Sequence, residues 1–139
     1  MILYSKPFVE KIEKDILGKT RRMKKPPVLA IVLVGNDPAS LSYIKRKEQT
    51  AQKLGCGAKL FHFPPNADEA EIIALIKKIN ADKKISGIIV QLPLPGKLNA
   101  DEIVSAIKES KDVDNLRGDS PFTSPAVQAI WQMLGTSGN

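Results

Sequence analysis

The sequence predicts an α/β fold of three layers, in which a mostly parallel sheet of about four strands carries helices on both faces. Two observations lead to this prediction. Apolar, β-branched runs without alternation are typical of parallel strands that are covered on both faces. Segments with helical periodicity separate these runs, as crossover connections between parallel strands usually do. The chain has 139 residues, which is enough for one domain with a proper core.

Three segments have the pattern of strands. Residues 28–34 and 88–90 are uninterrupted apolar runs. A third candidate covers residues 58–63 and is closed by two prolines, because proline lacks the backbone donor that a sheet ladder needs. Gln91 directly follows the run at 88–90, so a polar amide stands at the carboxyl end of that strand.

The segments between these strands have helical periodicity. In the first, Phe8, Ile12 and Ile16 recur at helical spacing with charged residues between them. Asn36 or Asp37 can cap the second helix, and a glycine follows its end. Helices are expected over residues 8–23, 38–54, 67–80, 99–110 and 126–134, with a loop over 111–125 and a tail over 135–139.

The composition excludes several functional classes. Charged residues interrupt every apolar segment, so we expect no membrane span and no membrane partner. The single histidine, His62, argues against a histidine-built metal site and is interpreted as structural. The single cysteine, Cys56, excludes an internal disulfide, fits a cytoplasmic location and is interpreted as a small buried residue rather than a nucleophile.

The net charge is +6, and the densest basic cluster covers residues 19–25. Such a cluster can bind a polyanion, and it can equally complement the dipole at a helix C-terminus. Only 5% of the residues are aromatic, so the stacking side chains that single-stranded nucleic acids need are missing. We therefore expect no nucleic-acid partner, whereas a polyglutamylated or phosphorylated small molecule would also suit a positive surface.

A candidate site begins on the helix at 38–54. Ser40, Tyr43 and Lys47 are spaced i, i+3 and i+7, so one helix face carries all three. The face starts near the carboxyl edge of the sheet, where a phenol and an ammonium would be proton donors within reach of a ligand. The same spacing is also typical of an amphipathic surface helix.

Two further positions are candidates for the same site. Gln91 lies at a strand end, where open α/β sheets bind ligands, although it could also cap a neighbouring backbone group. Asp112 and Asp114 lie in the loop at 111–125, where a carboxylate could accept two parallel donors or could tie the loop down. The sequence contains neither G-x-G-x-x-G nor G-x-x-x-x-G-K-[ST], so we expect no cofactor-binding residues in this chain.

Together, these segments resemble the N-terminal catalytic domain of the bifunctional methylenetetrahydrofolate dehydrogenase/cyclohydrolase family. The family pattern V-G-x-D-P-A-S-x-x-Y-V-x-x-K stands at residues 34–47, with isoleucine for its last valine. The pattern G-[IL]-[IL]-V-Q-L-P-L-P stands unbroken at 87–95, and K-D-V-D-G stands at 111–115 with Asn115 for the glycine. The resemblance covers roughly residues 8 to 116.

The resemblance implies roles for individual residues. Lys47 would be the catalytic amine of the cyclohydrolase step, and Gln91 would hydrogen-bond to it. Tyr43 would stack on the folate and help to hold Lys47, while Asp114 would anchor the amino-pyrimidine edge of the pterin. The implied catalytic residues are Lys47, Tyr43, Gln91 and Asp114, and the implied substrate-binding residues are Tyr43, Val90, Gln91, Leu92 and Asp114, with Ser42 and Asp112 as further candidates.

The implied chemistry belongs to one-carbon metabolism and purine biosynthesis. It comprises NADP-dependent oxidation of 5,10-methylenetetrahydrofolate to the methenyl form and its hydrolysis to 10-formyltetrahydrofolate. We expect residues 1–125 to form the folate-binding domain and 126–139 to lead towards the family's NADP-binding Rossmann domain, which is absent here. The dehydrogenase step is therefore not expected from this chain alone. The family is homodimeric, largely through that second domain, so this chain is expected to be monomeric.

The sequence departs from the family pattern after Asp114. Asn115 is a mild change, because asparagine tolerates left-handed backbone conformations. The segment 122–125 stands where the family has P-C-T-P, after a shorter gap, so contacts with the folate tail are expected to differ. Two alternative functions are a stand-alone, non-catalytic folate-binding domain and, on net charge alone, a nucleic-acid-binding module.

Overall fold

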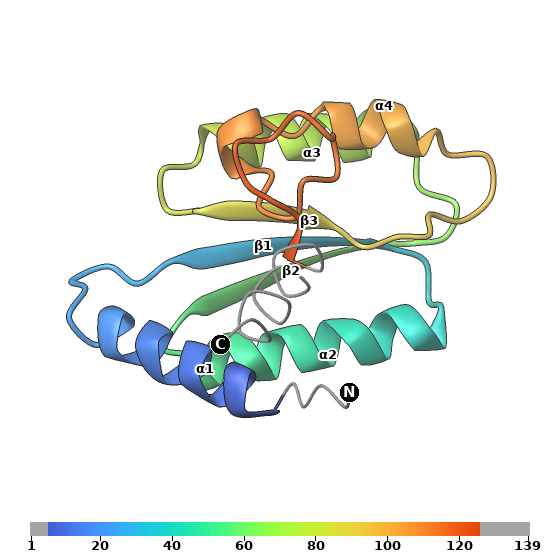
Figure 1. Cartoon of the computed structure of the whole chain (residues 1–139). Coiled ribbons are helices and arrows are strands. Elements are labelled where there is room, and N and C mark those ends of the chain that lie inside the picture. Colours follow the sequence, from blue (N-terminus) through green and yellow to red (C-terminus); the bar gives the residue numbers. More distant parts are fainter. Residues whose placement is uncertain (1–5, 126–139) are drawn as a thin grey trace.

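The computed structural model describes residues 6–125, and it confirms the α/β class (Figure 1). Its three strands are all parallel and form one sheet in the order β2-β1-β3. The strands are β1 (Val28–Val34), β2 (Gly57–Phe63) and β3 (Gly87–Val90). All three lie where the sequence predicts strands.

Helices cover both faces of the sheet, as the sequence predicts (Figure 1). One face carries α1 and α2, and the opposite face carries α3 and α4. No helix of residues 6–125 is long and apolar enough to cross a bilayer. The helices are α1 (Lys6–Thr20), α2 (Pro38–Lys53), α3 (Glu69–Ala81) and α4 (Ala100–Ser105), and a short 3-10 turn, η1 (Glu109–Lys111), follows them.

Two predictions about the extent of the elements are wrong. The described chain forms three strands rather than about four, one for each of the three segments whose sequence has a strand pattern. The helix predicted over 99–110 ends at Ser105, and the chain continues through a turn into η1. The helix predicted over 126–134 and the tail over 135–139 lie outside the described residues.

The core is divided unequally between the two faces of the sheet. Ala30, Val32 and Val34 belong to a cluster of eleven buried residues that also includes the inner sides of α3 and α4. Among residues 6–125, Ile31 and Leu33, which alternate with them along β1, form a cluster of three with Ile44 of α2. Within the described residues, the face under α2 is therefore thinly packed, and this leaves room for a cavity.

The helices that connect the strands move from one face of the sheet to the other at β1, where the strand order reverses. The helix that follows β1 covers one face, and the helix that leads to β3 covers the other. Because β1 and β3 are neighbours, their carboxyl ends form the switch point at which open α/β sheets bind ligands. The fold thus places the carboxyl ends of β1 and β3 beside the start of α2.

The loop after η1 packs back onto the start of β3. Val113 lies so close to Gly87 that a Cβ added to Gly87 would be 2.7 Å from Cγ1 of Val113 and 3.0 Å from its Cγ2. No real Cβ tolerates such a contact, so the glycine is needed for this loop to reach the sheet. This contact fixes where the next residue, Asp114, lies.

Gly87→Ala is therefore expected to destabilise the fold by about 1–3 kcal/mol, because Val113 and its loop must move away from β3. The measurement is the free energy of unfolding in urea. Gly18→Ala in α1 is the matched control, since nothing lies within 4 Å of its added Cβ; helix propensity predicts a gain of about 0.5–1 kcal/mol there. Equal stabilities for Gly87→Ala and the unmodified chain would contradict the Val113 contact.

Candidate functional site

The site begins at the turn between β1 and α2. Gly35 has a φ of +85°, a conformation that favours glycine, and it turns the chain sharply after β1. The Asp37 side chain caps α2 by accepting the Ser40 N–H at 2.8 Å, and this hydrogen bond lowers the pKa of Asp37. Pro38 occupies the first turn, as expected at a helix start. The start of α2 is thereby fixed beside the carboxyl end of β1.

A hydrogen bond between Lys47 and Gln91 is the centre of the site. Lys47 Nζ donates to Oε1 of Gln91 at 3.0 Å, across 44 residues of sequence. The other end of the Gln91 amide is also engaged, because its Nε2 donates to the Leu92 carbonyl at 3.0 Å. An ammonium can only donate, so both contacts are consistent with a single orientation of the amide. The predicted Lys47–Gln91 contact is present.

The alternation of β3 explains why Gln91 meets α2. Val90 is 1% exposed and belongs to the core under α3 and α4, so the next side chain along the strand points to the opposite face. That face is the one covered by α2. Gln91 is itself buried at 9% exposure, and its N–H continues the sheet by donating to the Val32 carbonyl at 2.9 Å.

Asp114 lies within electrostatic reach of Lys47. Its carboxyl is partly buried, and this desolvation raises the pKa of Asp114. The positive charge of Lys47 acts in the opposite direction, and the negative charge of Asp112 adds to the rise. No hydrogen bond within residues 6–125 engages the Asp114 side chain. It is therefore a carboxyl that a ligand could engage.

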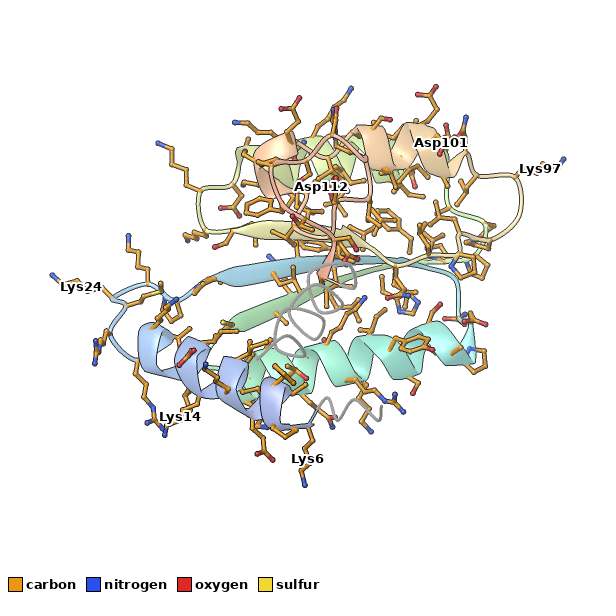
Figure 2. All side chains as sticks on the ribbon, viewed as in Figure 1. Lys6, Lys14, Lys24, Lys97, Asp101 and Asp112 are labelled. Atoms are coloured by element: carbon orange, nitrogen blue, oxygen red, sulfur yellow. The ribbon has the colours of Figure 1, made fainter. Side chains whose placement is uncertain are left out.

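Asp112 has a structural role rather than a place in the open site. It is 0% exposed, and Figure 2 shows it inside the loop, whereas Lys6, Lys97 and Asp101 project from the molecule. Its carboxylate accepts the backbone N–H groups of Leu116 at 3.0 Å and Arg117 at 2.9 Å. The alternative in which this aspartate ties down the loop is the one that the structure supports.

The remaining predicted residues differ in how far their side chains are exposed to solvent. Tyr43 is 56% exposed one turn before Lys47, but no hydrogen bond joins the two side chains in the described chain. Leu92 is 39% exposed, and Ser42 is exposed. Ser40 is 2% exposed, so it belongs to the packed side of the helix start.

A cavity of about 500 Å³ lies beside this group. Six residues of α2 and its end line it at helical spacing: Tyr43, Arg46, Lys47, Thr50, Ala51 and Leu54. The opposite wall includes Gly87 of β3 and Val113 of the packed loop. The cavity runs from the Lys47 end towards the starts of the strands, on the thinly packed face of the sheet.

Sequence reasoning missed part of this lining. Arg46, Thr50 and Ala51 could have been found by extending the spacing of Tyr43 and Lys47 by further helical turns. Val113 could not, because its contact with Gly87 depends on how a loop folds back onto a strand. Asn115 has a φ of +51°, a left-handed conformation that asparagine tolerates, so its replacement of the family's glycine is compatible with the turn.

The remaining polar candidates do not form a metal site. No group of three histidine, cysteine or acidic side chains in residues 6–125 is arranged to hold a metal ion. His62 Nε2 lies 2.8 Å from the Gly35 carbonyl, where it supports the turn after β1. Cys56 is half-buried and borders the cavity.

The sequence and the fold both match known proteins. Residues 3–114 match the family model described as tetrahydrofolate dehydrogenase/cyclohydrolase, catalytic domain. The bifunctional protein FolD of Helicobacter pylori is 42% identical over 118 residues, which cover 82% of this chain and 41% of the relative. That of Aquifex aeolicus is 37% identical over 110 residues, which cover 79% and 38%. The chain thus spans well under two thirds of the length of these relatives.

Solved structures agree with this match. The bifunctional FolD methylenetetrahydrofolate dehydrogenase/cyclohydrolase of Campylobacter jejuni superposes with a TM-score of 0.93 at 30% identity, covering 99% of this chain and 53% of that one. The Trypanosoma brucei enzyme, in a structure with NADP and an inhibitor, has the same fold, with a TM-score of 0.86 at 22% identity and coverages of 100% and 52%.

The raised pKa of Asp114 predicts a dependence of stability on pH. A carboxyl with a higher pKa in the folded state binds more protons there, so its contribution to stability is lost as pH rises from the ordinary aspartate range through that raised pKa. Asp114→Asn should therefore match the unmodified chain in Tm at acid pH and exceed it at neutral pH. Asp15→Asn, on exposed α1, is the control and should show a constant difference in Tm. A lower Tm for Asp114→Asn at neutral pH would contradict this prediction.

Proposed function

This chain belongs to the tetrahydrofolate dehydrogenase/cyclohydrolase family, and from this membership we propose that it binds a tetrahydrofolate beside Lys47 and supports hydrolysis of the 5,10-methenyl form. The observation that carries the proposal is the hydrogen bond from Lys47 Nζ to Gln91 Oε1 at 3.0 Å, with the Asp114 carboxyl close by. The product would be 10-formyltetrahydrofolate. The substrate class comes from the family, and the proposed roles rest on this geometry.

Hydrolysis needs a proton to move between water and nitrogen. Water adds to the carbon that bridges N5 and N10 of the folate and gives up one proton. The bond from this carbon to N5 then breaks as N5 takes a proton, and the remaining hydroxyl proton is lost as the formyl C=O forms, so one proton is released overall. We assign these transfers to Nζ of Lys47. Gln91 accepts one N–H of Lys47, so the rest of the amine has a fixed direction towards the ligand.

The other proposed substrate contacts follow from the shape of the site. Asp114 would accept two donors from the amino-pyrimidine edge of the pterin, and Tyr43 offers an exposed ring one helical turn from Lys47. Val90 can contribute only through its backbone, because its side chain is buried. Since the Gln91 N–H points to β1, the backbone groups of Val90 face away from β1, towards the side of β3 that is unpaired within residues 6–125.

The described residues do not fit NADP. A dinucleotide pyrophosphate binds at a glycine-rich turn before a helix N-terminus. Here the N-termini of α2 and α3 are each capped by an aspartate, Asp37 and Asp68, whose carboxylates accept the helix N–H groups. The acceptor of the hydride in the dehydrogenase reaction is therefore proposed to bind outside residues 6–125, and the residues described here hold the folate.

The presence of Lys47 and Gln91 beside Asp114 and Tyr43 favours a catalytic role over a non-catalytic folate-binding domain. A binding domain would need Asp114 and Tyr43, but it would have no use for a lysine that is oriented by a buried amide. We propose residues 1–125 as the folate-binding unit, with residues 126–139 leading on towards a dinucleotide-binding domain, and a cytoplasmic location. We propose no nucleic-acid partner, because aromatic side chains are scarce and the proposed folate site accounts for Lys47, Gln91 and Asp114.

Lys47→Met should lower the rate of 5,10-methenyltetrahydrofolate hydrolysis by about 100-fold or more, because a general acid–base group of this kind typically contributes 10²–10⁴-fold. Hydrolysis is followed by the loss of methenyl absorbance, with the uncatalysed rate subtracted. Lys45→Met is the matched control, since it removes the same charge from an exposed position of the same helix. Equal rates for the Lys47 and Lys45 variants, both above the uncatalysed rate, would refute the assignment of Lys47.

The chain is also expected to be monomeric, because the family dimerises largely through its second domain. Light scattering coupled to size exclusion at micromolar protein should give the mass of one chain, 15.2 kDa. A concentration-independent mass of two chains would contradict this expectation.

A further inference from the structure

Arg117 makes an unusually complete set of contacts for a partly exposed arginine. Its Nε and Nη2 donate to the two carboxylate oxygens of Asp119 at 2.8 and 2.9 Å. Its Nη1 donates to the carbonyls of Ser105 at 2.9 Å and Ile107 at 2.8 Å. These carbonyls belong to the end of α4 and the turn after it, where helical partners are missing. The guanidinium thus joins the loop after η1 to the end of α4.

The backbone of Arg117 is held as firmly as its side chain. Its N–H donates to Oδ2 of the fully buried Asp112 at 2.9 Å, while Oδ1 of the same carboxylate accepts the Leu116 N–H. The Asp112 carbonyl accepts the Ser120 hydroxyl at 2.6 Å. Asn115 closes the loop through Oδ1, which accepts the Ser120 N–H at 3.1 Å.

Asp114 lies inside this closed loop but takes no part in its hydrogen bonds. On one side of it, Asp112 is fixed by the contacts just described; on the other, Asn115 has a left-handed backbone, and Arg117 follows two residues later. Val113 packs on Gly87, so this end of the loop also rests on β3. The position of the Asp114 carboxyl relative to Lys47 therefore depends on the residues around it.

We propose that Arg117 is a positioning residue, which holds Asp114 at the place facing Lys47 where it receives the pterin edge of the folate. This inference rests on the proposed function for the identity of the ligand. Arg117 does not itself touch the ligand in this arrangement. It acts by closing the loop from Asp112 to Ser120 onto α4.

The planar guanidinium suits this task. It donates two parallel bonds to Asp119 while a third nitrogen reaches two carbonyls, and a lysine ammonium cannot match this fork geometry. Arg117→Lys is therefore the informative variant, because it keeps the charge and the length but loses the fork. Arg117→Ala removes both. Asp119→Asn leaves the bonds to α4 and weakens only the paired contact.

The first test measures tetrahydrofolate binding to the intact chain by calorimetric titration under reducing conditions. Arg117→Ala should raise the Kd about tenfold and Arg117→Lys by a smaller factor, since a small displacement of a binding group costs affinity. In an Asp114→Asn background, Arg117→Ala should change the Kd by less than about twofold, because the residue through which it acts is already altered. Arg21→Ala, an exposed arginine beyond α1, is the control and should leave the Kd unchanged.

A merely structural role would give a different pattern. Arg117→Ala would then lower the Tm and leave the Kd of the folded protein unchanged, or its effect on the Kd would persist in full in the Asp114→Asn background. Either result overturns the inference. Should Arg117→Ala fail to fold, Arg117→Lys and Asp119→Asn carry the same comparison.

A second readout does not depend on folate. The carboxyl carbon of Asp114 is titrated by NMR in the unmodified chain and in Arg117→Lys. Opening of the loop should solvate the carboxyl and bring its midpoint down towards the ordinary aspartate range, whereas an unchanged midpoint overturns the inference. If the unmodified chain binds no tetrahydrofolate but this midpoint moves, the proposed function fails and the positioning role of Arg117 stands.

Discussion

The two-residue alternation of β3 is the constraint on which the site depends. Val90 points into the core under α3 and α4, so Gln91 must point to the face that α2 covers. A shift of one residue in the pairing of β3 with β1 would bury the amide among isoleucines and turn a valine towards Lys47. The ladder bond from Gln91 to Val32 prevents that shift, and the Lys47 hydrogen bond is its consequence.

The unequal core of residues 6–125 explains where the cavity comes from. Most buried side chains gather between the sheet and α3 and α4, which gives the domain a dense, stable half. On the other face, the stripe of α2 from Tyr43 to Leu54 lines a cavity instead of interlocking with the strands. Within residues 6–125, one face of the sheet therefore carries most of the core, and the other borders the cavity. The short, apolar β3 serves both, since its alternate side chains belong to one face and then the other.

The same region shows a conflict between stability and function. Asp114 is partly desolvated, and its raised pKa means that the ionised carboxyl is disfavoured where it lies. Hydrogen bonds in the surrounding loop offset this unfavourable free energy. The buried Asp112 accepts two backbone N–H groups, and Arg117 donates to the end of α4 and to Asp119. A ligand with two parallel donors would supply the hydrogen-bond partners that the Asp114 carboxyl lacks within residues 6–125.

The sequence by itself determined the α/β class and the places of all three strands, because these follow from local periodicity, and its long motifs predicted the contact between Lys47 and Gln91. It also indicated that Asn115 would accept a left-handed backbone. Only the tertiary structure decided that α4 ends at Ser105, that Asp112 is a buried loop anchor and that Arg117 clamps the loop. These features depend on how the loop after η1 folds back onto α4 and β3, as in the contact of Val113 with Gly87, which no local pattern records. A motif can specify which side chains a site contains, whereas packing across the sheet decides which of them face one another.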